Sequence, residues 1–79
     1  MPTAKDVLNE IKWRDDMDFE DCVIFYVHRG VPGDFKTMKG EEVQDLGRSF
    51  IYTAGGQIPY HRVFKVEYKG ETLLSRKRS

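Results

Sequence analysis

The stretch CVIFYVH, residues 22–28, is a nearly continuous apolar run, and the fold is built around it. A run of this length in β-branched and aromatic residues, with an acidic cluster before it and turn glycines after it, predicts a central β-strand. Because side chains alternate along a strand, the odd-numbered residues share one face and the even-numbered residues the other. His28 therefore leaves the predicted sheet at the carboxyl end of the strand.

The start of the chain predicts a helix over residues 3–12. Thr3 and Asp6 have the spacing of a capping box, in which each residue satisfies a backbone N–H of the other. Apolar residues recur at the i, i+3, i+4, i+7 spacing of one helical face: Ala4, Val7, Leu8 and Ile11. We expect Trp13, just beyond, to fold back over the core as a large apolar cover.

The rest of the chain predicts short strands joined by turns. Alternating or β-prone segments are found at residues 35–38, 48–53, 58–61, 64–68 and 72–75. Residues 41–46 are expected to form a turn, residues 54–57 a hairpin turn, and Gly70 begins a last turn. In the segment 64–68, we expect Phe64, Val66 and Tyr68 to point inward.

These elements predict an α+β fold, in which one N-terminal helix packs on a small, mainly antiparallel sheet of about four or five strands. The 79 residues are expected to form a single domain over 1–79. With 39% hydrophobic and 33% charged residues, the composition is that of a globular chain rather than a disordered one.

Cysteine usage and hydropathy indicate the compartment. Cys22 is the only cysteine, so it cannot form an internal disulfide, and at the start of a central strand it is expected to be a small buried side chain rather than a nucleophile. No stretch approaches the roughly 18 apolar residues of a membrane span, and no signal-peptide pattern is present. We therefore expect a cytoplasmic protein without a membrane partner.

The net charge of zero hides two halves of opposite sign. Residues 1–45 hold six Lys or Arg against eleven Asp or Glu, and residues 46–79 hold seven against two. Total charge thus gives no argument for nucleic-acid binding, but a local basic surface could be built from Arg48, Arg62, Lys65, Lys69 and the tail 76–78. The simpler interpretation of the tail, a frayed C-terminus, is the one that we favour.

The acidic residues between Asp15 and Asp21 resemble a calcium-binding loop only superficially. Such a loop needs glycine at its sixth position and glutamate at its twelfth, where this chain has Asp21 and Val27. A solvated acidic turn is the better interpretation. Two histidines and one cysteine, far apart in the chain, also fall short of a ligand set, so no metal or cofactor is expected.

The two histidines of the chain each precede an arginine, in His28-Arg29 and in His61-Arg62. Arginine presents a planar fork of donors that fits phosphate oxygens, and histidine can donate, accept or carry a proton near neutral pH. The first pair leads into Pro32-Gly33, which favours a type II turn. If the fold brings the two pairs together, they make a phosphate-sized site.

These motifs give the chain a resemblance to the archaeal-type RNA cyclic group end recognition domain family. The resemblance rests on residues 6–9 with Trp13, on 28–34, on 48–50 and on 58–62, in that order. It implies recognition of RNA 3′ ends that carry a phosphate or a 2′,3′-cyclic phosphate. Because relatives are joined to phosphoesterase-like modules, it also implies a phosphoesterase or another RNA-processing protein as a partner.

Each motif residue is given a role on this interpretation. Arg29 and Arg62 are expected to contact the phosphate, and His28 and His61 to donate to it as charged groups. The remaining candidates are Gly30 for close backbone approach, Arg48 for an accessory contact and Tyr60 for stacking on a terminal base.

Two other classes of function stay open. Two histidines beside a cation can act as general base and acid, so the chain could be an RNA phosphodiesterase or a cyclic phosphate hydrolase. No flanking hydrolase motif accompanies them, which favours binding over catalysis. A small scaffold that contacts only other proteins is the third possibility, and it predicts that replacing His28 or His61 leaves RNA binding unchanged.

Overall fold

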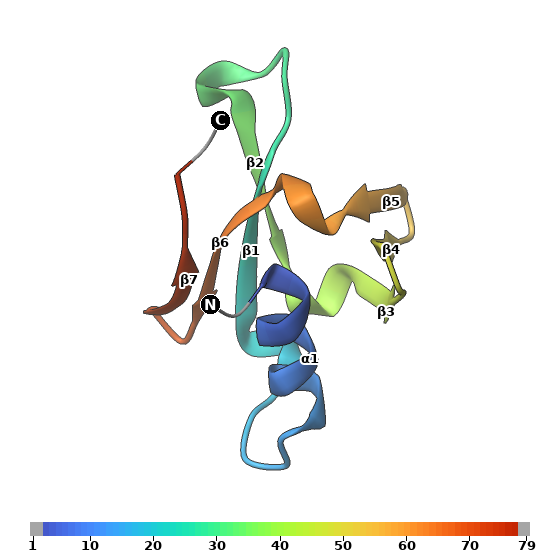
Figure 1. Ribbon diagram of the computed structural model, residues 1–79, viewed down its shortest axis with the longest axis vertical. Coiled ribbons are helices and arrows are strands. Elements are labelled where there is room, and N and C mark those ends of the chain that lie inside the picture. The colour runs from blue at the N-terminus through green and yellow to red at the C-terminus, as the bar shows by residue number, and fades with distance from the viewer. Residues whose placement is uncertain (1–2, 78–79) are drawn as a thin grey trace.

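β1 (Cys22–Val27) is an interior strand of an antiparallel sheet, as its apolar sequence predicts (Figure 1). In the computed structural model, which describes residues 3–77, β1 pairs with β2 (Phe35–Lys39) on one side and with β6 (Val63–Tyr68) on the other. β7 (Glu71–Ser75) pairs with β6, which gives the order β2-β1-β6-β7. The strands predicted near residues 35–38, 64–68 and 72–75 are confirmed.

α1 (Ala4–Trp13) packs on this sheet through the predicted face. Thr3 Oγ1 accepts the Asp6 N–H (3.1 Å) and the Thr3 N–H donates to the Asp6 carboxylate (3.0 Å), so the capping box is confirmed. The buried residues of the helix are those of the apolar spacing: Ala4, Val7, Leu8 and Ile11. With ten residues, α1 lacks the length to cross a membrane, and the described part of the chain has no other helix that could.

Trp13 does not cover the core, contrary to our expectation. Its side chain is 80% exposed. An α-helix turns by about 100° per residue, so Trp13 lies about 200° around the axis from Ile11 and away from the buried face. The phase of the helix therefore overrides the preference of a large aromatic side chain for burial.

A second sheet follows β2 and was not part of the predicted fold. The 3-10 helix η3 (Gly40–Glu42) leads into β3 (Val43–Leu46), which pairs with β4 (Phe50–Thr53), and β4 in turn pairs with β5 (Gly56–Pro59). The prediction of a turn at 41–46 is therefore wrong, whereas the hairpin turn between β4 and β5 is confirmed. The register of β3 shifts between Val43 and Asp45, which destroys the alternation by which a strand is recognised in a sequence.

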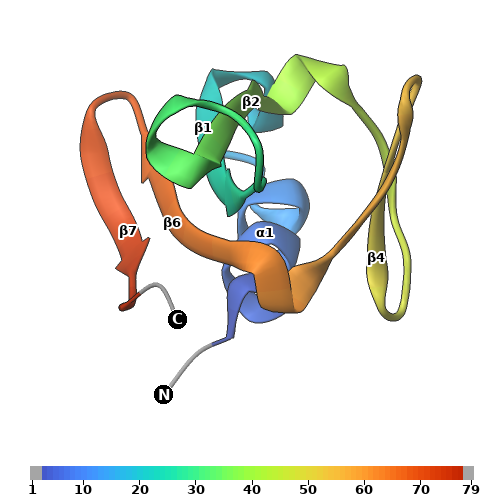
Figure 2. The same ribbon diagram turned by 90° about the horizontal axis from the view of Figure 1, so that it is seen from above.

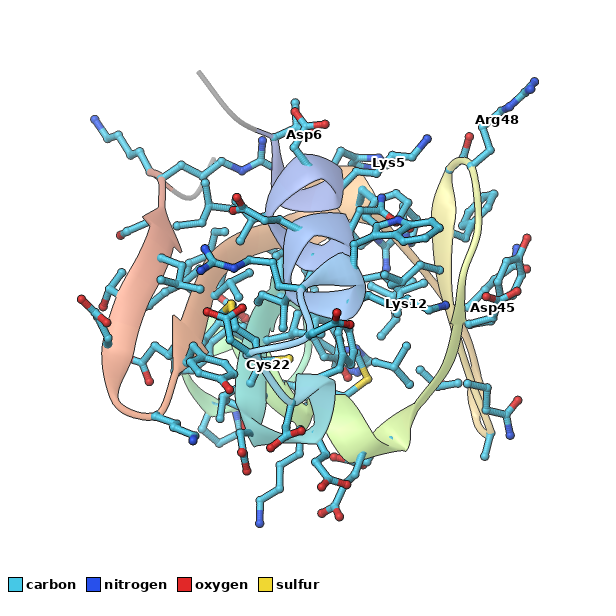
Figure 3. The ribbon with its side chains drawn as sticks, turned by 90° about the horizontal axis from the view of Figure 1, so that it is seen from below. Lys5, Asp6, Lys12, Cys22, Asp45 and Arg48 are labelled. Atoms are coloured by element: carbon cyan, nitrogen blue, oxygen red, sulfur yellow. The ribbon has the colours of Figure 1, made fainter. Side chains whose placement is uncertain are left out.

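The helix lies between the two sheets (Figure 2). Lys12 of α1 forms an ion pair with Asp45 of β3 (3.4 Å), which ties the helix to the second sheet (Figure 3). The fully buried side chains accordingly come from all three layers: Leu8, Ile11, Cys22, Ile24, Ile51, Val63 and Val66. The α+β class with its N-terminal helix and four-stranded antiparallel sheet is confirmed, and the three-stranded sheet is added to it.

β6 departs from simple alternation at Phe64. Its pairing with β1 shifts by one residue at this point, so Phe64 is the extra residue of a β-bulge. Val63 and Val66 are consequently both buried in the core. Phe64 packs instead against Phe25 and Phe35, with ring centroids 6.2 and 5.7 Å away, so its predicted inward orientation is wrong.

Candidate functional site

The pairing of β1 with β6 brings the two His-Arg pairs together. Tyr26 is opposite Val63 in this antiparallel ladder. His28 lies two residues after Tyr26 and His61 two residues before Val63, so both histidines meet at the same end of the ladder. Arg29 and Arg62, each next to one of these histidines in the chain, therefore lie at the same end of the ladder.

An open pocket of about 500 Å³ lies at this end, and both pairs form its walls. The lining residues are Val27, His28, Arg29, His61 and Arg62. In Figure 1, the 3-10 helix η4 (Tyr60–Arg62), drawn in orange before β6, crosses the carboxyl end of β1. The fold thus meets the condition under which the sequence predicts a phosphate-sized site.

The first pair is held by a closed loop. The His28 N–H donates to the Asp34 carbonyl oxygen (2.9 Å), which joins the two ends of the loop 28–34. Within it, the Asp34 N–H donates to the Val31 carbonyl (2.9 Å), and Gly33 has φ 79° and ψ −5°, the values of the third residue of a type II turn. The predicted turn is confirmed, and it fixes the return of the chain after Arg29.

The second pair lies in η4 rather than at the end of a strand. β5 ends at Pro59, immediately before η4, because proline has no N–H to continue a ladder. The strand predicted over 58–61 therefore lies two residues earlier than expected. The Val63 N–H donates to the Tyr60 carbonyl and closes the single turn. His61 and Arg62 are consequently presented on a short, hydrogen-bonded turn between two sheets.

Tyr60 has a structural place that does not fit the predicted stacking role. Its side chain is buried in the core, with 9% of its surface exposed, and its hydroxyl donates to the Gly47 carbonyl (2.8 Å). Burial raises the pKa of this hydroxyl above its ordinary value. A ring in this position offers no face to a terminal base, and it serves instead to anchor η4 to the loop after β3.

The two arginines and two histidines that line the pocket have no acidic partner within residues 3–77. Arg29, His61 and Arg62 are exposed, and His28 is half-buried with its ring edge-on to that of Tyr26 (6.4 Å). Within residues 3–77, every ion pair is made by a cation outside the pocket: Lys12, Arg14, Lys65 or Lys69. The donors of both arginines therefore face solvent, where a compact anion can reach them.

Besides Tyr60, two predicted site residues do not line this pocket. Arg48 lies in the loop between β3 and β4 and points away from the molecule (Figure 3). Gly30 is exposed in the turn after Arg29, with φ 92°, and is absent from the pocket wall. The geometry thus unites four of the seven candidates: His28, Arg29, His61 and Arg62.

The predicted basic surface is divided rather than continuous. Lys65 lies over the ring of Phe25 (5.0 Å) and is paired with Glu67, whereas Lys69 is 3.9 Å from the Asp21 carboxylate. Arg76, in the tail that we expected to fray, is hydrogen-bonded to the backbone of His61 in η4 and of Val63 at the start of β6. Arg78, the last cation of the predicted basic tail, lies outside the described residues.

Cys22 is confirmed as a small buried side chain. Burial raises the pKa of its thiol to about 11, so it stays protonated at neutral pH. Within residues 3–77, no three His, Cys, Asp or Glu side chains gather as a metal site would require.

Two residues near this pocket are not predicted as part of it: Val27, and Arg76, which the sequence assigns only to a basic tail. Val27 was identified as a strand residue, but its place in the wall depends on where β1 ends. The contacts of Arg76 depend on the register of β7, for which the sequence carries no separate signal.

A family model described as the MJ1316 RNA cyclic group end recognition domain matches residues 1–76. The UPF0248 protein of Archaeoglobus fulgidus is 30% identical over 70 residues, which cover 87% of this chain and 99% of the relative. The UPF0248 protein of Thermococcus onnurineus is 36% identical, covering 91% and 82%, and UPF0248 protein MJ1316 of Methanocaldococcus jannaschii is 33% identical, covering 92% of each. No solved structure matches the chain significantly.

Proposed function

The chain belongs to the MJ1316 RNA cyclic group end recognition domain family, and we propose that it is a module that binds RNA ends carrying a phosphate or a 2′,3′-cyclic phosphate. The observation that carries this proposal is the pocket in which both His-Arg pairs meet without a carboxylate. A terminal phosphate is the part of the RNA that enters this pocket.

The chemistry of the pocket suits a compact anion. Arg29 and Arg62 each present a planar fork of donors, and such forks bind phosphate oxygens with charge-assisted hydrogen bonds. His28 and His61 add imidazole N–H donors to the same pocket. The pocket volume of about 500 Å³ is within the range of small-ligand sites, which is enough for one terminal nucleotide.

Recognition of an end rather than a backbone track follows from the size of the pocket. A protein that follows a strand neutralises many phosphates and shows a steep dependence of affinity on salt. The two pocket arginines can engage one phosphate group at a time, so a shallow slope is expected. A module of this kind leaves the processing of the end to a phosphoesterase or another RNA-processing protein, which is the partner class that we propose.

The presence of two imidazoles on one pocket wall also favours a second candidate, a hydrolase that opens the cyclic phosphate. One histidine would take a proton from water and the other would give a proton to the leaving ribose oxygen. Binding and hydrolysis make different predictions for the mass of the RNA, so a single experiment separates them.

That experiment compares short RNAs of one sequence that end in 2′,3′-cyclic phosphate, in 3′-phosphate or in hydroxyl. Fluorescence anisotropy measures affinity, and mass spectrometry follows the RNA end. We expect tighter binding of the phosphorylated ends, lost in His61→Ala and Arg62→Ala, with no change of mass. Addition of one water to the cyclic end, abolished by His28→Ala or His61→Ala, would make the protein a hydrolase, and equal or absent binding of all three RNAs would leave the scaffold role.

A further inference from the structure

Arg76 joins the end of β7 to the wall of the pocket. Its Nε donates to the Val63 carbonyl (2.9 Å) and its Nη2 donates to the His61 carbonyl (2.7 Å). Its backbone N–H also donates to the Phe64 carbonyl (2.8 Å), just beyond the paired part of β7. One residue thus holds three carbonyl groups at the junction between η4 and β6, those of residues 61, 63 and 64.

We propose that Arg76 is a positioning residue of the pocket, and that its guanidinium fork fixes the His61–Arg62 and Val63–Phe64 peptide groups. This inference rests on the proposed function, since it concerns the same phosphate-binding pocket. Arg76 holds the carbonyls of His61 and Val63, and Arg62 lies between these two residues in the chain. The orientation of both side chains toward the pocket depends on how these peptide groups are turned.

Beyond the hydrogen bonds of Tyr60 at the start of η4, the junction has little other support. The ladder between β1 and β6 is irregular here, because the bulge at Phe64 interrupts the pairing just after Val63. η4 is a single 3-10 turn, which is a weakly held element by itself. The two charge-assisted hydrogen bonds of the Arg76 guanidinium therefore fix the orientation of the backbone next to the pocket residues His61 and Arg62.

The role requires the shape of arginine and not its charge alone. A guanidinium presents two parallel donors in a fixed plane, whereas a lysine ammonium is a single point on a flexible stem. Arg76 does not itself line the pocket, and two of its donors are used on carbonyl oxygens. It acts on a phosphate through His61 and Arg62 rather than by contact.

The test uses the full chain with Arg76→Ala and Arg76→Lys, and Lys77→Ala as a matched control. Lys77 is the next residue, carries the same charge, is exposed, and has no hydrogen bond or ion pair within residues 3–77. Affinity for an RNA with a 2′,3′-cyclic phosphate and for the same RNA with a hydroxyl end is measured by anisotropy at several salt concentrations. All measurements are made at a temperature well below the midpoint of thermal unfolding of each variant.

We expect Arg76→Ala to lose about tenfold in affinity for the cyclic end and Arg76→Lys to lose nearly as much, while Lys77→Ala changes it less than about twofold. The slope of log affinity against log salt should stay that of the wild type in Arg76→Ala. Full retention of affinity by Arg76→Lys, or equal losses in Arg76→Ala and Lys77→Ala, would overturn the proposal, because charge would then suffice. A slope reduced by about one in Arg76→Ala would also overturn it, since Arg76 would contact phosphate directly.

Failure of this inference can be told apart from failure of the proposed function. If the wild type prefers the cyclic end and Arg76→Ala keeps that preference in full, the positioning role is wrong and the binding function stands. If the wild type itself shows no preference for the cyclic end, the proposed function is wrong, whatever the Arg76 variants show. Should Arg76→Ala not fold, Arg76→Lys still carries the test, because it keeps the charge and the aliphatic stem.

Discussion

His28 and His61 line one pocket because β1 and β6 are antiparallel neighbours whose register places Tyr26 opposite Val63. Residues that follow β1 and residues that precede β6 must then emerge at the same end of the sheet. A repeated His-Arg pair in a sequence becomes a single pocket through this strand pairing, and its arginines present donors of the kind that bind phosphate.

Replacing a pocket arginine should weaken binding of a phosphorylated RNA end. We expect Arg62→Ala to lower affinity about tenfold or more and to reduce the slope of log affinity against log salt by about one. Arg48→Ala is the matched control, since Arg48 is an exposed arginine outside the pocket wall, and it should change neither quantity appreciably. Equal effects of the two substitutions in salt-dependent anisotropy would mean that general basicity, not the pocket, attracts the RNA.

Affinity for a cyclic phosphate end should fall as the pH rises from 5 to 8. Histidines change protonation over this interval, whereas the pocket arginines stay charged throughout it and cannot contribute to the change. The cyclic phosphate is the right probe because a phosphodiester keeps one negative charge across the range. Anisotropy at constant ionic strength measures the effect, and the double variant His28→Ala/His61→Ala should show a flat profile. A flat profile in the wild type would remove the histidines from phosphate binding.

Gly40 should tolerate no side chain. A Cβ at this position would overlap the carbonyl oxygen of Phe19 and crowd Cys22 Sγ, so the backbone of η1 (Phe19–Asp21) would have to move. We expect Gly40→Ala to lower the free energy of unfolding by about 3 kcal/mol. Gly55→Ala is the control, because nothing lies near its Cβ, and it should change stability by less than about 1 kcal/mol. Urea denaturation of both variants decides the matter; similar stabilities would show that η1 yields easily.

Ionisation of Cys22 should destabilise the fold at high pH. Burial raises the pKa of the thiol from an ordinary 9.0 to about 11, so the folded state favours the protonated form. The stabilisation is complete below pH 9 and is lost as the pH rises toward 11, at roughly 1.4 kcal/mol per pH unit. The free energies of unfolding of the wild type and Cys22→Ala, measured by denaturation at each pH, should therefore approach each other between pH 9 and 11. A difference in the free energy of unfolding that stays constant over this range would contradict the burial of the thiol, because all other ionisable groups are the same in both proteins.

The elements that local sequence determines could be predicted. The capping box of Thr3 and Asp6 and the spacing from Ala4 to Ile11 define α1, and the apolar run defines β1. The site followed as a conditional prediction: two His-Arg pairs bind phosphate if they meet. Whether they meet depends on strand pairing, which is set by contacts between distant residues.

What could not be predicted depends on register and phase. The bulge at Phe64 turns that side chain to the other face of the sheet. The register shift in β3 removes the alternation of side chains, so the sequence of this strand resembles that of a turn. Tyr60 has the motif position of a ligand contact but the burial of a core residue. Arg76 belongs to a tail with the composition of a frayed terminus, and only its hydrogen bonds to the backbone of residues 61, 63 and 64 reveal a role.

The most direct test of the account is to locate the bound RNA end by nuclear magnetic resonance. The isotope-labelled full chain is titrated with a short RNA that ends in 2′,3′-cyclic phosphate, and amide and arginine Nε–H signals are followed. We predict the largest shifts at residues 28–29 and 61–62, with the indole N–H of the exposed Trp13 unchanged. Saturable shifts centred on Trp13 or the second sheet, with the pocket signals unmoved, would show that the two His-Arg pairs are not the site.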